Sequence, residues 1–270
     1  MVEAGIAEVF AELDARFNRA LDRVSDGAAP MTLLYSGGVD STLVALALRG
    51  RGPFEALVVG TGHGGDTGRA RAAGELVGLR VREVRVGDPD VARVLAQERP
   101  LLDGLREPAR SVQVAMALAV EASGTPRVLT GQGADELFGG YAHFRGLRTE
   151  ALEARRAEDL DRLIGTDWPL SRGIAARRGH DLRSPFLDEE FVRYAKTLPL
   201  APVGSDGLTK PLLRQWAVHR GVPRVIALEP KHAMQYGSGV AAMVRRVARS
   251  GDIPVTPGVG REPNPGGPPD

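Results

Sequence analysis

The stretch MTLLYSGGVDSTLVALAL spans residues 31–48 and decides the fold. Its apolar start, 31–35, predicts a strand, and the apolar run 42–48 predicts a helix, with a glycine turn between them. Two glycines allow the backbone to approach an anion closely, and the N–H groups at a helix start favour negative charge. The anion-facing residues are therefore expected to be Ser36, Gly37, Gly38, Ser41 and Thr42.

Asp40 places a carboxylate in this turn, where bare phosphate would be repelled. A divalent cation such as Mg²⁺ is therefore expected to bridge the carboxylate and the phosphate. The alternative is a glycine turn that merely joins a strand to a helix. The Walker loop is excluded, because no Gly-Lys-Ser/Thr follows four spacer residues.

The pattern SGGxDS resembles the PP-loop of ATP pyrophosphatases, which cleave ATP between its α and β phosphates. A second element, GQGADELFGGY at 131–141, follows the short apolar run 128–130. Its glycine pairs around an acidic pair predict tight backbone beside a second metal-binding carboxylate, Asp135. With Asp40, it would supply two carboxylates for magnesium on pyrophosphate.

This second element is similar to the signature of the synthetase domain of asparagine synthetases, and further matches follow in the same order. They are RSPFLD at 183–188, KPLLR at 210–214, and Lys231 with QYGSG at 235–239. The ordered matches cover roughly residues 30 to 240, which exceeds what one short motif gives by chance. The resemblance implies an ATP-dependent, AMP-forming amide ligase with ATP and Mg²⁺ as cofactors and aspartate as the default carboxylate.

The resemblance also assigns site residues. It implies that Asp40 and Asp135 hold the metal, and that Lys231 stabilises the leaving pyrophosphate; one more surface lysine is the alternative for Lys231. The nucleotide-binding set would add Val59, Thr130, Gly131, Gly133 and Lys210. For the apolar strand-end residues, core packing is nearly as good an explanation.

Four charged residues carry open alternatives. Lys210 and Arg214 are four residues apart, so one helix face would direct both at one ligand, although a solvent-exposed face explains them almost as well. Arg183 and Asp188 flank Pro185, which favours an ion-pair or loop-shaping role over substrate contact.

The chain departs from the family pattern in two ways. Gln132 stands where asparagine synthetases have a glutamate that is thought to help proton transfer, and a neutral amide cannot act as a general base. The chain also has no cysteine and too few residues for the N-terminal glutaminase domain of full-length relatives. Free ammonia, another amine or a separate glutaminase partner is therefore expected to supply nitrogen.

Composition agrees with an ordinary soluble enzyme of 270 residues and net charge +1. Near-neutral charge disfavours a nucleic-acid or membrane partner, and arginine pairs such as Arg155-Arg156 are expected to be solvated helix faces. The absence of cysteine excludes disulfides, thiolate zinc sites and iron–sulfur clusters within the chain. With no apolar run of membrane-spanning length, we expect a cytoplasmic protein; a homo-oligomer stays open.

The order of elements predicts an α/β fold with a doubly wound, mostly parallel, five-stranded type of sheet and a helical C-terminal half. Strands are expected at 31–35, 54–59, 80–86 and 126–130. Helices are expected at 2–24, 39–49, 66–77, 89–97, 108–123, 145–164, 188–197, 209–219 and 239–249. One domain would span 1–250, with an N-terminal helix (1–26), a nucleotide-binding core (30–142) and a helical part (143–250); the Pro/Gly-rich residues 251–270 are expected to be disordered.

Two other functions stay open at this point. A tRNA-modifying PP-loop enzyme would activate a base instead of a carboxylate, but the missing cysteine and the GADE run disfavour it. A nucleotide-binding regulatory protein that has lost catalysis is supported only by Gln132.

Overall fold

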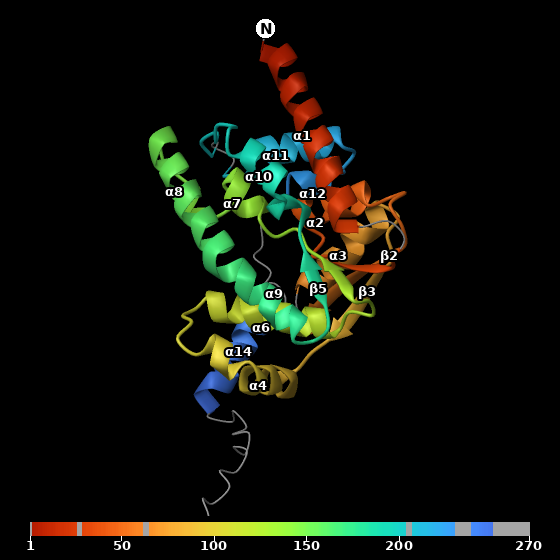
Figure 1. Ribbon diagram of the computed structural model, residues 1–270, viewed down its shortest axis with the longest axis vertical. Coiled ribbons are helices and arrows are strands. Elements are labelled where there is room, and N and C mark those ends of the chain that lie inside the picture. The colour runs from red at the N-terminus through yellow and green to blue at the C-terminus, as the bar shows by residue number, and fades with distance from the viewer. Residues whose placement is uncertain (1, 26–28, 62–64, 204–206, 230–238, 251–270) are drawn as a thin grey trace, which may run out of the picture.

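The structure, a computed structural model, describes residues 2–25, 29–61, 65–203, 207–229 and 239–250 (Figure 1). Its strands form one sheet in the order β3-β2-β1-β4-β5, and every neighbouring pair runs parallel. The strands are β1 Met31–Leu34, β2 Phe54–Gly60, β3 Val81–Arg85, β4 Arg127–Leu129 and β5 Asp181–Arg183. The predicted parallel α/β fold is confirmed.

The central strand β1 pairs on one side with β2 and on the other with β4, so Met31 lies between Phe54 and Arg127. The chain builds outward from β1 to β2 and β3, then crosses back to place β4 on the opposite flank. The strand order therefore reverses between β1 and β4. In parallel sheets the crevice beyond the carboxyl ends at such a reversal is where ligands bind.

Two layers of helices cover the sheet, because alternate residues of the buried strands face opposite sides. Leu33 and Val58 belong to one apolar core, and Leu34 and Leu57 belong to the other. The first core is closed by α1 Val2–Ser25, α2 Val39–Ala47, α3 Gly65–Leu76, α10 Glu189–Ala195, α11 Pro211–His219 and α12 Arg224–Ala227. The second is closed by α4 Asp88–Gln97, α6 Ala109–Glu121, α9 Trp168–Ala176 and α14 Val240–Ser250.

The remaining elements connect these layers. They are α5 Arg99–Leu102, α7 Ala134–Phe138, the 3-10 turn η1 Ala142–Phe144, α8 Thr149–Arg162, the π-helical turn η2 Leu163–Asp167 and the 3-10 turn η3 Pro185–Leu187. Figure 1 shows α8 running along one side of the molecule from the upper helices down to α9.

Aromatic packing joins the N-terminal helix to the second half of the chain. The Phe17 ring lies 5.0 Å from Phe186, 5.4 Å from Phe191 and 5.1 Å from Trp216, measured between centroids. All four side chains are fully buried. The expected amphipathic helix at the start of the chain is confirmed, and it holds η3, α10 and α11 against the sheet.

The structure differs from the predicted elements in several places, and it contains the short helices α5, α7 and α12, which the sequence pattern does not predict. The expected helix 145–164 begins at Thr149 and continues through η2 into α9, which the sequence pattern did not predict. Strand β5 was also not predicted. Arg156 was expected on a solvated face but is buried, and it donates to the carbonyls of Ala195, Lys196 and Leu198.

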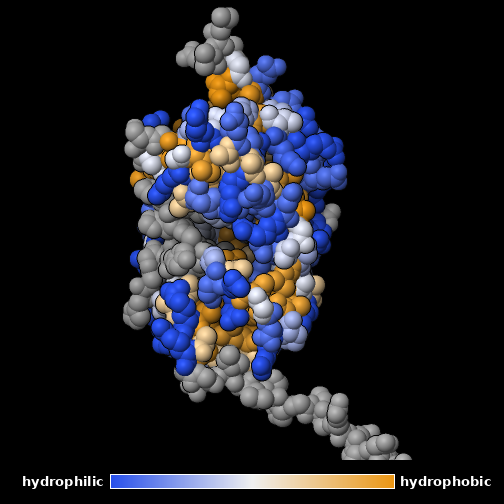
Figure 2. Space-filling model, turned by 90° about the vertical axis from the view of Figure 1, so that its left-hand side faces the viewer, coloured by the Kyte–Doolittle hydropathy of each residue, from blue (hydrophilic) through white to orange (hydrophobic). Residues whose placement is uncertain are grey.

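The surface shown in Figure 2 is mostly hydrophilic in its upper half, whereas apolar residues gather in its lower half. Across the described ranges, we find no helix with both the length and the apolar character needed to cross a membrane.

Candidate functional site

The loop after β1 is organised by its own serines. The hydroxyls of Ser36 and Ser41 lie 3.2 Å apart, and Ser41 Oγ donates to the Gly38 carbonyl at 3.2 Å. Helix α2 begins at Val39 with Gly38 as its N-cap, and no side chain caps it. Such a helix start is suited to an anion.

The expectation that Thr42 faces the anion is wrong. Thr42 is fully buried, and its hydroxyl lies 3.0 Å from the Tyr35 hydroxyl.

Gly37 shows why this loop needs glycine. Its φ is +74°, and a Cβ there would lie 2.7 Å from Ala70 Cα and 2.9 Å from the Arg69 carbonyl oxygen. Arg69 Nε in turn donates to the Ser36 carbonyl at 3.3 Å. Helix α3 is thus packed directly onto the loop, in a way that any side chain at position 37 would prevent.

The loop after β4 meets the first loop at the reversal point of the sheet. Thr130 N–H donates to the Arg183 carbonyl at 3.0 Å, which fixes the end of the strand. A Cβ on Gly131 would lie 3.2 Å from Asp40 Cβ, so the two loops touch. A Cβ on Gly140 would lie only 1.9 Å from Asp135 Oδ1, so only glycine leaves room for this carboxylate in its present position.

Lys210 joins the two predicted metal ligands. Its Nζ lies 2.6 Å from both carboxylate oxygens of Asp40 and 2.9 Å from Asp135 Oδ1. The lysine side chain is 1% exposed, and each carboxylate is 22% exposed. The expectation that the two acidic groups converge at neighbouring strand ends agrees with this geometry.

The charge state of Lys210 follows from these contacts. Burial lowers its pKa, but the charges of Asp135 and Asp40 and the hydrogen bonds to them outweigh burial, so the pKa lies above its ordinary value. The amine therefore carries a positive charge at neutral pH.

The RSPFLD segment, residues 183–188, packs against the loop that follows β4. Ser184 Oγ donates to the Gln132 carbonyl at 2.6 Å. Gly133 has φ +99°, and a Cβ there would lie 2.7 Å from Leu187 Cδ2. The charged residues at the two ends of this segment form ion pairs, as expected. Arg183 pairs with Asp181, and Asp188 pairs with Arg23.

Gln132 itself presents an unsatisfied acceptor. Its side-chain oxygen Oε1 is buried, and none of the described residues donates a hydrogen bond to it. A buried acceptor without a donor costs about 1–3 kcal/mol, so a ligand N–H or a water is the expected partner.

Arg214 does not share a ligand-facing side with Lys210. Lys210 precedes α11 in a left-handed conformation with φ +58°, so helical spacing does not apply to the pair. The buried Arg214 guanidinium donates to the carbonyls of Thr209, Ala227 and Glu229. It thus links the residue before Lys210 to the end of α12.

The last predicted motif lies mostly outside the described residues. Lys231 and residues 235–238 lie outside them, so the proposed role of Lys231 stays a prediction. Gly239 is described, and a Cβ there would lie 2.6 Å from Cγ2 of Thr61, the residue that follows β2. Val59 is 8% exposed and packs in the second apolar core, which favours core packing over a ligand role.

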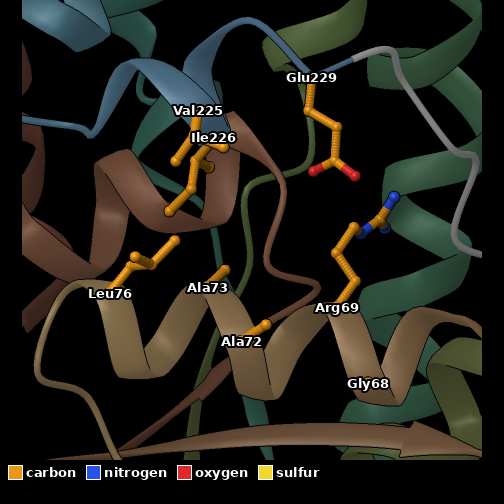
Figure 3. A pocket seen from close by; sticks show the side chains of 8 residues that line it. All are labelled: Gly68, Arg69, Ala72, Ala73, Leu76, Val225, Ile226 and Glu229. Atoms are coloured by element: carbon orange, nitrogen blue, oxygen red, sulfur yellow. The ribbon is translucent and has the colours of Figure 1, made fainter.

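A separate open cleft lies between α3 and α12 (Figure 3). Figure 3 shows Arg69 and Glu229 reaching toward each other at one end, with apolar side chains at the other. The lining residues are Gly68, Arg69, Ala72, Ala73, Leu76, Val225, Ile226 and Glu229. None of the predicted site residues lines it.

The residues present fit a divalent cation and a phosphate. Two carboxylates already converge on a single ammonium, and hard carboxylate oxygens are preferred ligands of Mg²⁺. The glycine turn and the start of α2 lie beside them and offer a phosphate cradle that a Cβ on Gly37 would disturb. Within the described part of the chain, no three His, Cys, Asp or Glu side chains form a metal-binding group.

Comparison with known proteins finds relatives over most of this chain. A putative glutamine-hydrolysing asparagine synthetase of Methanocaldococcus jannaschii is 28% identical over 86% of this chain and 50% of its own length. The carboxyethyl-arginine beta-lactam-synthase of Streptomyces clavuligerus is 26% identical over 89% of this chain and 47% of its own length. The chain thus spans about half the length of these relatives.

Among solved structures, a U34-tRNA thiolase of Methanococcus maripaludis matches with a TM-score of 0.40 and 14% identity, over 90% of this chain and 80% of that one. A protein-family model also matches the chain. The match is to the family described as asparagine synthase, over residues 12–173 and 159–251, which include both strand-end loops and the Lys210 segment. This chain belongs to the asparagine synthase family.

Proposed function

We propose that this chain is an ATP-dependent, AMP-forming ligase that activates a carboxylate and transfers its acyl group to a nitrogen nucleophile. The observation that carries the proposal is the convergence of Asp40 and Asp135, from two strand-end loops, on one cation at the reversal point of a parallel sheet. Membership of the asparagine synthase family supports the same reaction class.

ATP would bind with its phosphates over the glycine turn, where Gly37 and the start of α2 present backbone N–H groups. Asp40 and Asp135 would hold Mg²⁺, which neutralises charge on the phosphates when bound. The Lys210 ammonium lies 2.6 Å from Asp40 Oδ1 and so places a positive charge directly beside this metal position. Lys231 would stabilise the leaving pyrophosphate, as its place in the motif order implies.

The reaction has two bond exchanges. A carboxylate oxygen attacks the α-phosphorus of ATP, and pyrophosphate leaves with the electron pair of the broken P–O bond. The nitrogen nucleophile then attacks the acyl carbon, AMP leaves, and the nitrogen loses a proton. The chain's task is to hold the phosphates and the carboxylate in line while charge develops on the leaving oxygens.

Aspartate and ammonia are the default substrates, and a separate glutaminase or another amine could replace ammonia. The two relatives named above are an asparagine synthetase and a beta-lactam synthase, so one scaffold serves different acceptors. Gln132 bears on the acceptor. Its amide cannot take a proton, but its buried Oε1 can accept an N–H from the attacking nitrogen.

The test is pyrophosphate exchange into ATP with Mg²⁺ and a panel of carboxylates, aspartate first. We expect exchange with at least one carboxylate and its loss in Asp40→Asn, with Asp103→Asn as a matched surface control because Asp103 is 68% exposed. Exchange that persists in Asp40→Asn would remove Asp40 from the site. Binding of ATP without exchange for any carboxylate would favour the regulatory alternative.

A second variant separates the two halves of the reaction. Gln132→Glu should leave pyrophosphate exchange within about threefold, because activation needs no base at this position, and should change the rate of amide formation. If neither rate changes, Gln132 does not contact the attacking nitrogen.

A further inference from the structure

Lys210 occupies the position that the proposed function gives to a metal ion. Its ammonium lies 2.6 Å from Asp40 Oδ1, 2.6 Å from Asp40 Oδ2 and 2.9 Å from Asp135 Oδ1. A cation surrounded by three carboxylate oxygens, with a side chain that is only 1% exposed, is a filled cation site. The two acidic groups are therefore already neutralised in large part by the protein itself.

The two carboxylates alone offer a divalent ion too few oxygen ligands for it to displace the Lys210 ammonium. Mg²⁺ prefers six oxygen ligands in near-octahedral geometry and gives up its water reluctantly. Asp40 and Asp135 supply only part of that shell. A metal ion entering beside Lys210 would also be repelled by the ammonium at close range.

The arrival of a triphosphate changes this balance. The phosphates add negative charge and oxygen ligands at the glycine turn, beside Asp40. They can complete the shell of the metal ion and also accept the lysine ammonium, which binds phosphate as a point charge.

The Lys210 ammonium can move while the backbone of residues 209–214 stays in place. The Lys210 carbonyl accepts from Arg214 N–H at 3.0 Å, and Arg214 Nε donates to the preceding Thr209 carbonyl at 2.5 Å. Pro211 follows at the first position of α11. The base of the side chain is thus fixed, whereas its four-carbon stem retains rotatable bonds that can redirect the ammonium.

We propose that Lys210 is a positioning residue: its ammonium holds Asp40 and Asp135 together before the nucleotide binds, and it excludes a divalent cation from the pair until the nucleotide's phosphates draw it away. This inference rests on the nucleotide site of the proposed function, but not on the carboxylate or the nitrogen donor. It makes metal binding dependent on the nucleotide, with Lys210 as the cause.

The experiment measures Mn²⁺ binding by electron paramagnetic resonance, with and without α,β-methylene-ATP, which cannot be cleaved between its α and β phosphates. We expect the wild-type protein to bind one Mn²⁺ per chain at least about tenfold more tightly with the analogue than without it. We expect Lys210→Met to bind Mn²⁺ without the analogue at least about tenfold more tightly than the wild type, because the carboxylates lose their ammonium. The added Asp135→Asn change should remove that site again.

Two controls separate this role from a merely structural one. Lys196→Met removes an exposed lysine and should bind Mn²⁺ as the wild type does. Lys210→Arg keeps the positive charge and should still exclude Mn²⁺ without the analogue. Circular dichroism checks the fold of each variant, and Lys210→Gln, which also lacks the ammonium, carries the same test if Lys210→Met does not fold.

The proposal is overturned if the wild type already has a Mn²⁺ site without the analogue and the analogue does not tighten it, or if folded Lys210→Met gains no site. The proposed function fails separately. In that case the wild type gains no Mn²⁺ site with the analogue, although Lys210→Met gains one without it.

Discussion

At the scale of single residues, the site depends on glycines that let charged groups approach. Gly131 brings the second loop against Asp40, and Gly140 leaves room for the carboxylate of Asp135. Gly37 allows α3 to pack on the first loop. The contacts at Gly37 and Gly131 involve backbone or Cβ atoms that no rotamer can move, and at Gly140 the Asp135 Cα would lie 2.9 Å from an added methyl group.

We expect Gly37→Ala to lower the free energy of unfolding by about 2–4 kcal/mol, because it adds a steric clash to an unfavourable backbone conformation. Gly50→Ala is a matched control: its φ is +81°, but a Cβ there meets no atom within 4 Å. It should cost only about 1 kcal/mol. Urea unfolding measures both. Equal losses would mean that the contact with α3 contributes nothing.

The convergence of Asp40 and Asp135 was predictable, because both follow strands and the carboxyl ends of parallel strands share one edge. The position of Lys210 between them was not. The spacing from Lys210 to Arg214 suggested one helix face, but Lys210 adopts a left-handed conformation before the helix starts. A short motif does not reveal which backbone conformation its first residue takes.

At the scale of elements, the buried Arg156 links α8 to the end of α10. It donates to the carbonyls of Leu198 at 2.7 Å and Lys196 at 2.9 Å, and it pairs with Glu153. The last carbonyls of a helix have no partner within the helix. Arg156 supplies one from a neighbouring element, which its charged surroundings in the sequence do not indicate.

We expect Arg156→Met to lower the free energy of unfolding by about 2–4 kcal/mol, because methionine fills similar space but leaves buried carbonyls without donors. Arg193→Ala on α10 is the control. Arg193 is 71% exposed and pairs only with Glu189 one turn away among the contacts described, so its loss should cost less than about 0.5 kcal/mol. Thermal and urea unfolding of both variants measure the difference. Similar effects would show that the carbonyl contacts are weak.

The elements that sequence patterns missed are short or interrupted. Strand β5 has three residues, Asp181, Leu182 and Arg183, of which only Leu182 is buried. Such a segment has no alternation to detect, and its pairing with β4 is a long-range contact. Helix α9 carries Pro169 and Gly173, which suggest breaks in a pattern. The longer apolar strands β1 and β2 were predicted because both of their faces are buried.

At the scale of the whole molecule, the last described helix packs against the middle of the chain. Helix α14 lies beside α4 and α6 in the lower layer (Figure 1). Val240, Met243 and Val244 are buried in the second core. Outside the core, Arg246 binds Asp88, the first residue of α4, through two contacts.

The Asp88–Arg246 pair should make this docking depend on pH. The hydrogen bond from Arg246 lowers the pKa of Asp88 below its ordinary value of 3.8. A carboxyl group with a lowered folded-state pKa stabilises the fold fully above its unfolded value, and this contribution is lost as pH falls through the folded-state pKa. The Arg246 side chain is 56% exposed and the Asp88 side chain is 40% exposed, so solvent screening keeps the contribution small.

A double-mutant cycle with Asp88→Asn and Arg246→Gln isolates the pair. We expect a favourable coupling energy near neutral pH that decreases as pH falls below 3.8 and decreases with added salt. Urea unfolding, repeated from about pH 7 down to the lowest pH at which the protein stays folded, measures it. The same cycle on Arg99 and Asp103, which are 62% and 68% exposed, should give a smaller coupling energy. A coupling energy that grows on acidification would show that Asp88 stabilises the fold in its protonated form, opposite to the sign derived from its pKa.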